Sequence, residues 1–187
     1  MQRILLTISI ALSLGFATAT HAVPITYEAT LQNGVPVTGT NTQTAGNAVN
    51  PVGANYFRFF ANTGDSVTVI GDRLTGAFDM SFWIYEGLFA ETDGFGGSFG
   101  SGSIAFGDDQ DPPNISGPFG DPNVNFTAGT TGFYTVAVTN FLSSNQPPYG
   151  FQLVARGIQN QSVPEPASLA LLGLGLAGVA AMRRKKS

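Results

Sequence analysis

Apolar and polar residues alternate along much of the chain, and a period of two is typical of β-strands that bury one face. In residues 66–70 hydroxyl side chains alternate with valine, and in residues 133–140 Tyr134, Val136 and Val138 share one face. Helical periodicity is absent between the two ends of the chain. By the same criteria we expect further strands at residues 25–31, 56–60, 77–86, 104–106, 124–127 and 149–156.

Glycine- and proline-rich turns separate these segments, since the 187 residues include 24 Gly and 11 Pro. About seven or eight short strands joined by such turns predict a single all-β domain, a jelly-roll-like β-sandwich. Residues 38–50 are polar and weakly patterned, so we expect a long loop or a loosely held edge there. Residues 87–103 are mostly Gly, Ser and Phe and predict a flexible loop.

The segment 77–86 is apolar on both faces, because Trp83 and Tyr85 lie opposite a face made of Phe and aliphatic side chains. Such a strand is either central and covered on each side, or it carries a binding face. In the second case Trp83 and Tyr85 would bind glycan by stacking on sugar rings, with help from Phe95 and Phe99. Positions in a core or between sheets are the alternative for these aromatic residues.

The N-terminus has the order of a secretory signal peptide. Arg3 supplies the charge, residues 4–16 form an apolar stretch, and Thr20-His21-Ala22 is a small-x-small cleavage site. We therefore expect signal peptidase and the secretion machinery to remove residues 1–22 and leave Val23 first. An uncleaved anchor is the alternative.

The C-terminus has three parts with separate physical roles. The prolines of Pro164-Glu165-Pro166 favour an extended, accessible backbone. The uncharged run 167–182 is marginal in length for a transmembrane helix, which needs ~17–25 residues. Four cations then hold the end on the cytoplasmic side, namely Arg183, Arg184, Lys185 and Lys186.

This order resembles the PEP-CTERM sorting signal of Gram-negative bacteria. The resemblance implies recognition by a membrane exosortase, which processes the tail near the motif. It also implies export to the cell surface or extracellular matrix of an exopolysaccharide producer, with membrane contact only through this segment before processing. The expected organisation is a signal peptide at 1–22, an N-terminal strand and polar loop at 23–55, the sandwich at 56–158, a linker at 159–163 and the sorting signal at 164–187.

Removal of both ends changes the charge balance. Residues 23–163 keep eleven of the twelve acidic residues but only three arginines, so their net charge is −8. A domain this acidic, without lysine, is not a nucleic-acid binder by its charge. Cysteine is absent, so the exported domain must be held by its core or by a metal ion.

Strand and turn motifs follow one another along the body of the chain. They are residues 56–59 and 62–69, Asp79 before an aromatic strand, and residues 107–109, 124–128, 131–138 and 149–151. In order and spacing this series resembles bacterial pre-peptidase C-terminal domains. That resemblance implies a small β-sandwich that accompanies secreted enzymes and sometimes binds calcium or polysaccharide-like partners. The insertion at 87–103 and the Pro-rich loop at 112–122 depart from the family's pattern, and we expect no catalytic domain beside the sandwich.

Candidate chemistry is narrow, because residues 23–163 contain no His, Cys or Lys. Catalytic triads, Cys–His pairs and His-ligated metals are therefore excluded. A carboxylate-dependent hydrolase that pairs Asp79 with Glu86 or Glu91 remains as an alternative, although acids at strand ends are usually solvated. We name no catalytic residue and expect the protein not to be an enzyme.

An acidic loop is the better candidate site. Asp108, Asp109 and Asp111 lie within four residues, and Asp121 follows in the adjoining loop. Calcium prefers ~6–8 oxygen ligands, which two such loops could supply, whereas solvated turns are the alternative. We therefore expect a non-enzymatic surface or matrix protein with a structural or adhesive role near exopolysaccharide and with calcium-stiffened loops. A polysaccharide-binding module is the runner-up.

Overall fold

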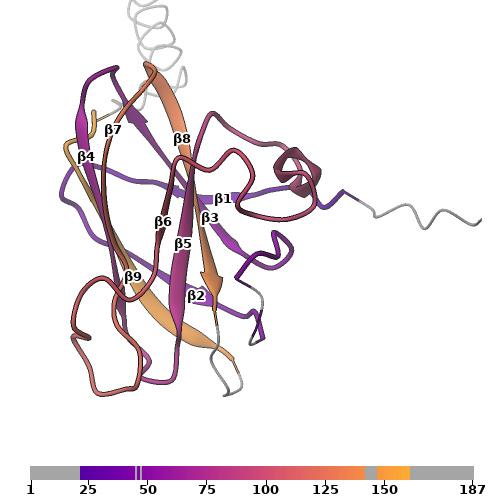
Figure 1. Cartoon of the computed structure of the whole chain (residues 1–187), viewed down its shortest axis with the longest axis vertical. Helices are drawn as coiled ribbons and strands as arrows, with labels where there is room; N and C mark the ends of the chain where they lie inside the picture. Colours follow the sequence, from indigo (N-terminus) through magenta and orange to yellow (C-terminus); the bar gives the residue numbers. More distant parts are fainter. Residues whose placement is uncertain (1–21, 45, 47, 142–146, 161–187) are drawn as a thin grey trace, which may run out of the picture.

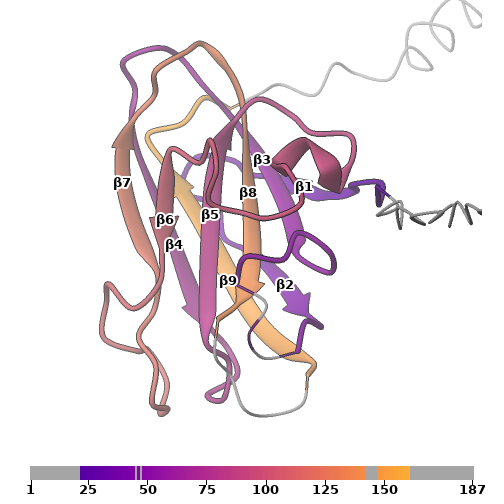
Figure 2. The same cartoon turned by 45° about the vertical axis from the view of Figure 1, so that its right-hand side comes forward.

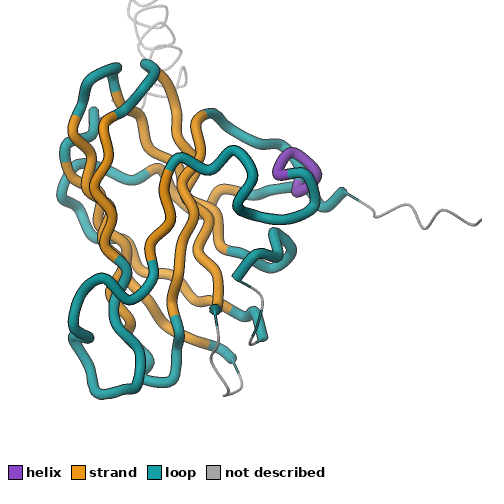
Figure 3. Tube along the Cα trace, viewed as in Figure 1, coloured by secondary structure: helices purple, strands orange, loops and turns teal. Residues whose placement is uncertain are grey.

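The structure is a computed structural model that describes residues 22–44, 46, 48–141 and 147–160. Two β-sheets face each other (Figures 1 and 2), which confirms the all-β sandwich. Within the described ranges a single short 3-10 helix, η1 (Thr92–Phe95), interrupts the strands and loops (Figure 3). No helix there is long and apolar enough to cross a membrane.

One sheet has five strands and the other has four. The five-stranded sheet has the order β1 (Tyr27–Thr30), β3 (Asn55–Ala61), β8 (Gly132–Asn140), β5 (Met80–Glu86) and β6 (Ala105–Gly107). The four-stranded sheet has the order β2 (Val37–Asn41), β9 (Tyr149–Arg156), β4 (Ser66–Arg73) and β7 (Asn123–Thr127). β1 runs parallel to β3, whereas the other pairs of strands are antiparallel.

One strand differs from the sequence expectations. β2 overlaps the segment 38–50 that was expected to be a loop or a loose edge, and it is an edge strand paired with β9. Gly39 explains how it fits, because an added Cβ would lie 2.3 Å from Cζ of Phe151 on that neighbour. Both β1 and β2 precede residue 56, so the segment 23–55 contributes to both sheets.

The hydrophobic core lies between the sheets. Alternate residues of β3, β5 and β8 face those of β4 and β9, as the period of two predicts. Their side chains are fully buried, as for Phe59, Phe82, Val136 and Leu153. Since fully burying one such side chain stabilises the fold by about 1.5–3 kcal/mol, this layer is the main source of stability.

A second aromatic layer covers the outer face of the five-stranded sheet. Tyr56 and Tyr85 point outward and are packed under Phe95 and Phe99 from the loop 87–103. We call this set the outer aromatic cluster. It explains why 77–86 is apolar on both faces, because β5 is central and covered on each side.

Candidate metal centre

Three carboxylates meet at one edge of the five-stranded sheet. Asp79 directly precedes β5, and Asp108 and Asp109 directly follow β6. The two strands are antiparallel with Phe82 opposite Gly107, so the start of one and the end of the other lie side by side. One oxygen from each carboxylate lies within 4.8 Å of the other two. We call these residues the tricarboxylate cluster.

The cluster takes part of its negative charge out of water. Asp79 is buried, and Asp108 is half-buried beside it. Burial, followed by the charges of Asp109 and Asp79, raises the pKa of Asp108 to about 6. Oδ1 of Asp108 is buried and accepts no hydrogen bond from a described residue. A buried acceptor of this kind costs free energy unless a donor or a cation reaches it.

The donor set fits calcium. Carboxylate oxygens are the ligands that Ca²⁺ prefers, and the exposed side of Asp109 leaves room for water ligands. Bound there, the ion would neutralise the repulsion among the three acids. Asp109 also accepts a hydrogen bond from the backbone N–H of Gly120, so an ion would connect the β5–β6 edge to the loop before β7.

The structure places the other two expected ligands elsewhere. Asp111 and Asp121 exchange two backbone hydrogen bonds of 2.9 Å, and Asp111 Oδ2 accepts one from the Asn123 amide at 2.7 Å. Asp121 is buried and forms an ion pair with Arg73, at 3.0 Å between Oδ1 and Nε. Of the four expected ligands, two thus belong to the cluster and two lie outside it.

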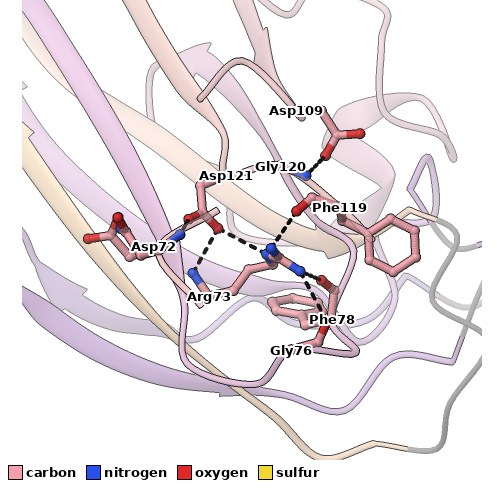
Figure 4. A network of polar contacts seen from close by, with 9 residues as sticks. Asp72, Arg73, Gly76, Phe78, Asp109, Phe119, Gly120 and Asp121 are labelled. Atoms are coloured by element: carbon pink, nitrogen blue, oxygen red, sulfur yellow. Dashed lines mark hydrogen bonds and ion pairs between the residues drawn. The ribbon is translucent and has the colours of Figure 1, made fainter. Parts of the chain in front are cut away.

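Arg73 holds together the loops around Asp121 (Figure 4). The side chain is fully buried and donates to the carbonyl oxygens of Gly76, Phe78 and Phe119 as well as to Asp121. Since Phe78 precedes Asp79, these bonds also fix the strand start that carries the buried acid. We call Arg73 and Asp121 the buried ion pair. Its sequence signal was weak, because nothing local in the pattern separates Arg73 from an exposed arginine.

In the sequence, Asp79 stands out only within the family resemblance and as a partner for Glu86 or Glu91. A usable signal did exist, since an acid before one strand and two acids after its hairpin partner meet at the same edge. Glu86 lies at the far end of β5, about 23 Å away for seven residues of strand, and is exposed. Glu91 is exposed as well, so neither glutamate joins Asp79.

The structure also shows the surroundings of the expected glycan-binding residues. Tyr85 is 2% exposed and accepts a hydrogen bond at its hydroxyl from the backbone N–H of Gly100. Trp83 is half-buried, its ring lies 4.2 Å from that of Phe106, and its Nε1 donates to the Ala48 carbonyl at 2.7 Å. A sugar ring would reach Tyr85 only after loop 87–103 had moved, whereas Trp83 keeps part of its surface in solvent.

The expected signal peptide, the sorting motif Pro164-Glu165-Pro166 and the four C-terminal cations lie outside the described residues. Comparison with known families covers this tail. Residues 162–185 match the model of the PEP-CTERM protein-sorting motif, which confirms the sorting signal. No curated protein matches the chain in sequence.

Several solved structures are similar to the chain. The pre-peptidase C-terminal domain of a collagenase from Bacillus anthracis is 14% identical, with a TM-score of 0.44 over 71% of this chain and 98% of that one. PliG, a periplasmic inhibitor of g-type lysozyme from Aeromonas hydrophila, is 15% identical, with a TM-score of 0.41 over 67% and 83%. CorA, a surface-associated copper-binding protein of Methylomicrobium album BG8, is 10% identical, with a TM-score of 0.48 over 71% and 98%.

One of these structures is a pre-peptidase C-terminal domain, the family that the strand motifs of this chain resemble. At these identities and TM-scores no residue role is transferred from any of the three. The chain is thus a β-sandwich that carries a PEP-CTERM sorting signal at residues 162–185, and this signal marks an exported precursor for exosortase processing.

Proposed function

We propose that the chain is a non-enzymatic protein of the cell surface or extracellular matrix of a Gram-negative bacterium. Its role would be structural or adhesive, in association with exopolysaccharide. The observation that carries the proposal is the match of residues 162–185 to the PEP-CTERM protein-sorting motif. The sequence supports it, because residues 23–163 lack the His, Cys and Lys that most catalytic centres use.

Calcium would act on the loops at one end of the sandwich. Asp79, Asp108 and Asp109 would supply the carboxylate ligands, and water would complete the coordination shell. The ion's charge would replace the repulsion among three neighbouring acids, of which Asp79 is buried, by an attractive interaction. In an exported domain without cysteine, such an ion would do the work of a disulfide by fixing loops that lie far apart in the sequence.

A polysaccharide-binding module is the second candidate. The rings of the half-buried Trp83 and of Phe106 are tilted to each other with centroids 4.2 Å apart, and cross-strand pairing puts both side chains on the outer face of the sheet. The strand of Phe106 ends directly before Asp108. Aromatic surface next to convergent polar groups is the usual lining of a small-molecule site. Glycan contact would therefore centre on Trp83 rather than on the covered Tyr85.

The test is sedimentation of the full chain, in mild detergent, with exopolysaccharide from its own host. Calcium-dependent co-sedimentation that is lost with chelator and in Asp108→Asn would support the proposal. Glu86→Gln is the matched control, since it removes the same charge at the other end of β5. Protein that stays in the supernatant with and without calcium would rule out direct glycan association.

A further inference from the structure

Arg58 is a positioned cation on the outer face of the five-stranded sheet. Its Nε donates to Thr30 Oγ1 at 2.8 Å, and Cζ lies 5.6 Å from the ring centroid of Tyr27 and 5.5 Å from that of Phe133. The Tyr27 ring is itself fixed, because its hydroxyl lies 2.8 Å from Thr135 Oγ1 and accepts from the Phe89 N–H at 2.9 Å. The guanidinium is therefore oriented before any ligand arrives.

No described carboxylate forms an ion pair with Arg58. The ion pair found within 4.0 Å in the described ranges is that of Arg73 and Asp121, so Arg58 has no acidic partner there. An arginine without an acidic partner is notable here, because residues 23–163 contain eleven acidic residues and only three arginines. An oriented guanidinium without a carboxylate is a ready site for one, because the two groups match in bidentate geometry.

Aromatic rings with accessible surface flank the guanidinium. Phe60 and Phe133 form an edge-to-face pair with centroids 5.4 Å apart, and both are half-buried. Gly87, directly after β5, donates its N–H to the Phe133 carbonyl at 2.8 Å and has open space where a Cβ would lie. We call Tyr27, Arg58, Phe60 and Phe133 the Arg58 patch. It offers a carboxylate site between apolar faces.

The C-terminal end of the described chain arrives at this patch. The Gln159 N–H donates to the Phe60 carbonyl at 2.9 Å, in an antiparallel bridge. Four residues separate Asn160 from Glu165, and five steps of extended chain span at most ~17 Å. From a point beside Phe60 the tail can therefore reach Arg58, which lies two residues back along the same strand.

We propose that the sorting motif Pro164-Glu165-Pro166 docks on the Arg58 patch of its own chain. Glu165 would pair with Arg58, and the two prolines would pack on the rings of Phe60 and Phe133. Proline-rich extended segments commonly bind aromatic surfaces in this way. The motif's order, an acid between two prolines, complements a cation between aromatic rings.

The tether makes even a weak contact matter. A short linker gives an effective concentration in the mM range, so an intrinsic Kd of about 1 mM would keep the motif docked about half of the time. Docking would compete with the exosortase for the same residues, so that the folded body slows its own processing. The inference rests on the sorting signal alone and needs neither calcium nor polysaccharide.

The test measures how fast a proline-specific endopeptidase cuts the Pro164–Glu165 bond in the full chain in detergent micelles, followed by mass spectrometry. Arg58→Ala should speed the cut by about two- to tenfold. In the Glu165→Gln background, Arg58→Ala should have no further effect on the cutting rate. Because Glu165 adjoins the cleaved bond, Glu165→Gln can itself change the rate, and this double-mutant comparison cancels that change. Exchange of charges, Arg58→Glu with Glu165→Arg, should restore protection.

Arg156→Ala is the matched control, because it removes an exposed arginine from the other sheet. Indole fluorescence checks that each variant is folded, and Arg58→Lys gives a milder change with intermediate protection. Equal cutting rates in wild type and Arg58→Ala would overturn the proposal, as would an equal speed-up with and without Glu165. If Arg58→Ala leaves the protection of the tail unchanged but abolishes retention on immobilised polygalacturonate, the patch would instead be assigned to an acidic polysaccharide.

Discussion

Asp121→Asn should be among the most destabilising isosteric changes in the sandwich. Asp121 accepts three hydrogen bonds, from the backbone N–H and Nε of Arg73 at 3.1 and 3.0 Å and from the Asn114 N–H at 2.8 Å. The asparagine keeps the shape but leaves the Arg73 charge buried without a counter-ion. Its amide group also cannot accept at both positions, so one N–H loses its acceptor.

The expected loss follows from the burial of both partners, whose side chains are 0% and 2% exposed. Removing one partner of a buried ion pair costs about 3–5 kcal/mol in the free energy of unfolding. For a domain of this size 1 kcal/mol shifts Tm by about 3–4 °C, so a loss of this size should lower Tm by about 9–20 °C. Arg73→Met with Asp121→Asn should recover little, because the carbonyl oxygens of Gly76, Phe78 and Phe119 then lose this donor.

Urea unfolding followed by the fluorescence of Trp83, the single tryptophan, measures this loss. Arg156→Ala, an exposed arginine, should stay within about 0.5 kcal/mol of wild type. A loss below about 1 kcal/mol for Asp121→Asn would refute the reasoning, because it would mean that water replaces the missing charge.

Three further predictions follow from the same structure. Calcium at about 100 times its Kd should raise the free energy of unfolding by about 2.7 kcal/mol, which thermal melts measure. Asp108→Asn should abolish this stabilisation, whereas Glu86→Gln should keep it. Without calcium, the raised pKa of Asp108 means that the folded state holds a proton that the unfolded state has lost, so stability should fall as pH rises from about 4 to about 6. A series of thermal melts at different pH values measures this slope, which should disappear in Asp108→Asn. Phe95→Ala should cost about 3 kcal/mol and shift the Trp83 emission to the red, because the outer aromatic cluster loses its central ring; an unshifted spectrum would show that loop 87–103 stays closed without it.

Much of the sandwich was predictable from the period of two. β4, β8 and β9 alternate visibly, because each has one face in the core and the other toward solvent or the outer layer. β2 was not predictable, since its residues are polar and it forms through pairing with β9 and through the space that Gly39 leaves for Phe151. Edge strands depend on their partner more than on their own pattern.

The candidate site was predictable only in part, for a related reason. Asp108 and Asp109 stood out by proximity in the sequence, but their neighbour Asp79 is brought in by the register between β5 and β6. Asp121 resembles them in sequence and yet serves Arg73, 48 residues away. Composition identifies residues that could bind a cation, whereas long-range pairing decides which carboxylates are already engaged.

The strand β8 connects two chemically different poles of the molecule. Phe133 at its start lies beside Phe60, where the tail departs, and Phe141 just past its end donates its N–H to the carbonyl of Asp79. About eight residues of strand, or ~26 Å, separate these poles. Under the proposed function, the attachment through the tail and the candidate metal centre would therefore lie at opposite ends of β8. Each sandwich would act as a rigid spacer that holds its acidic loops away from the surface.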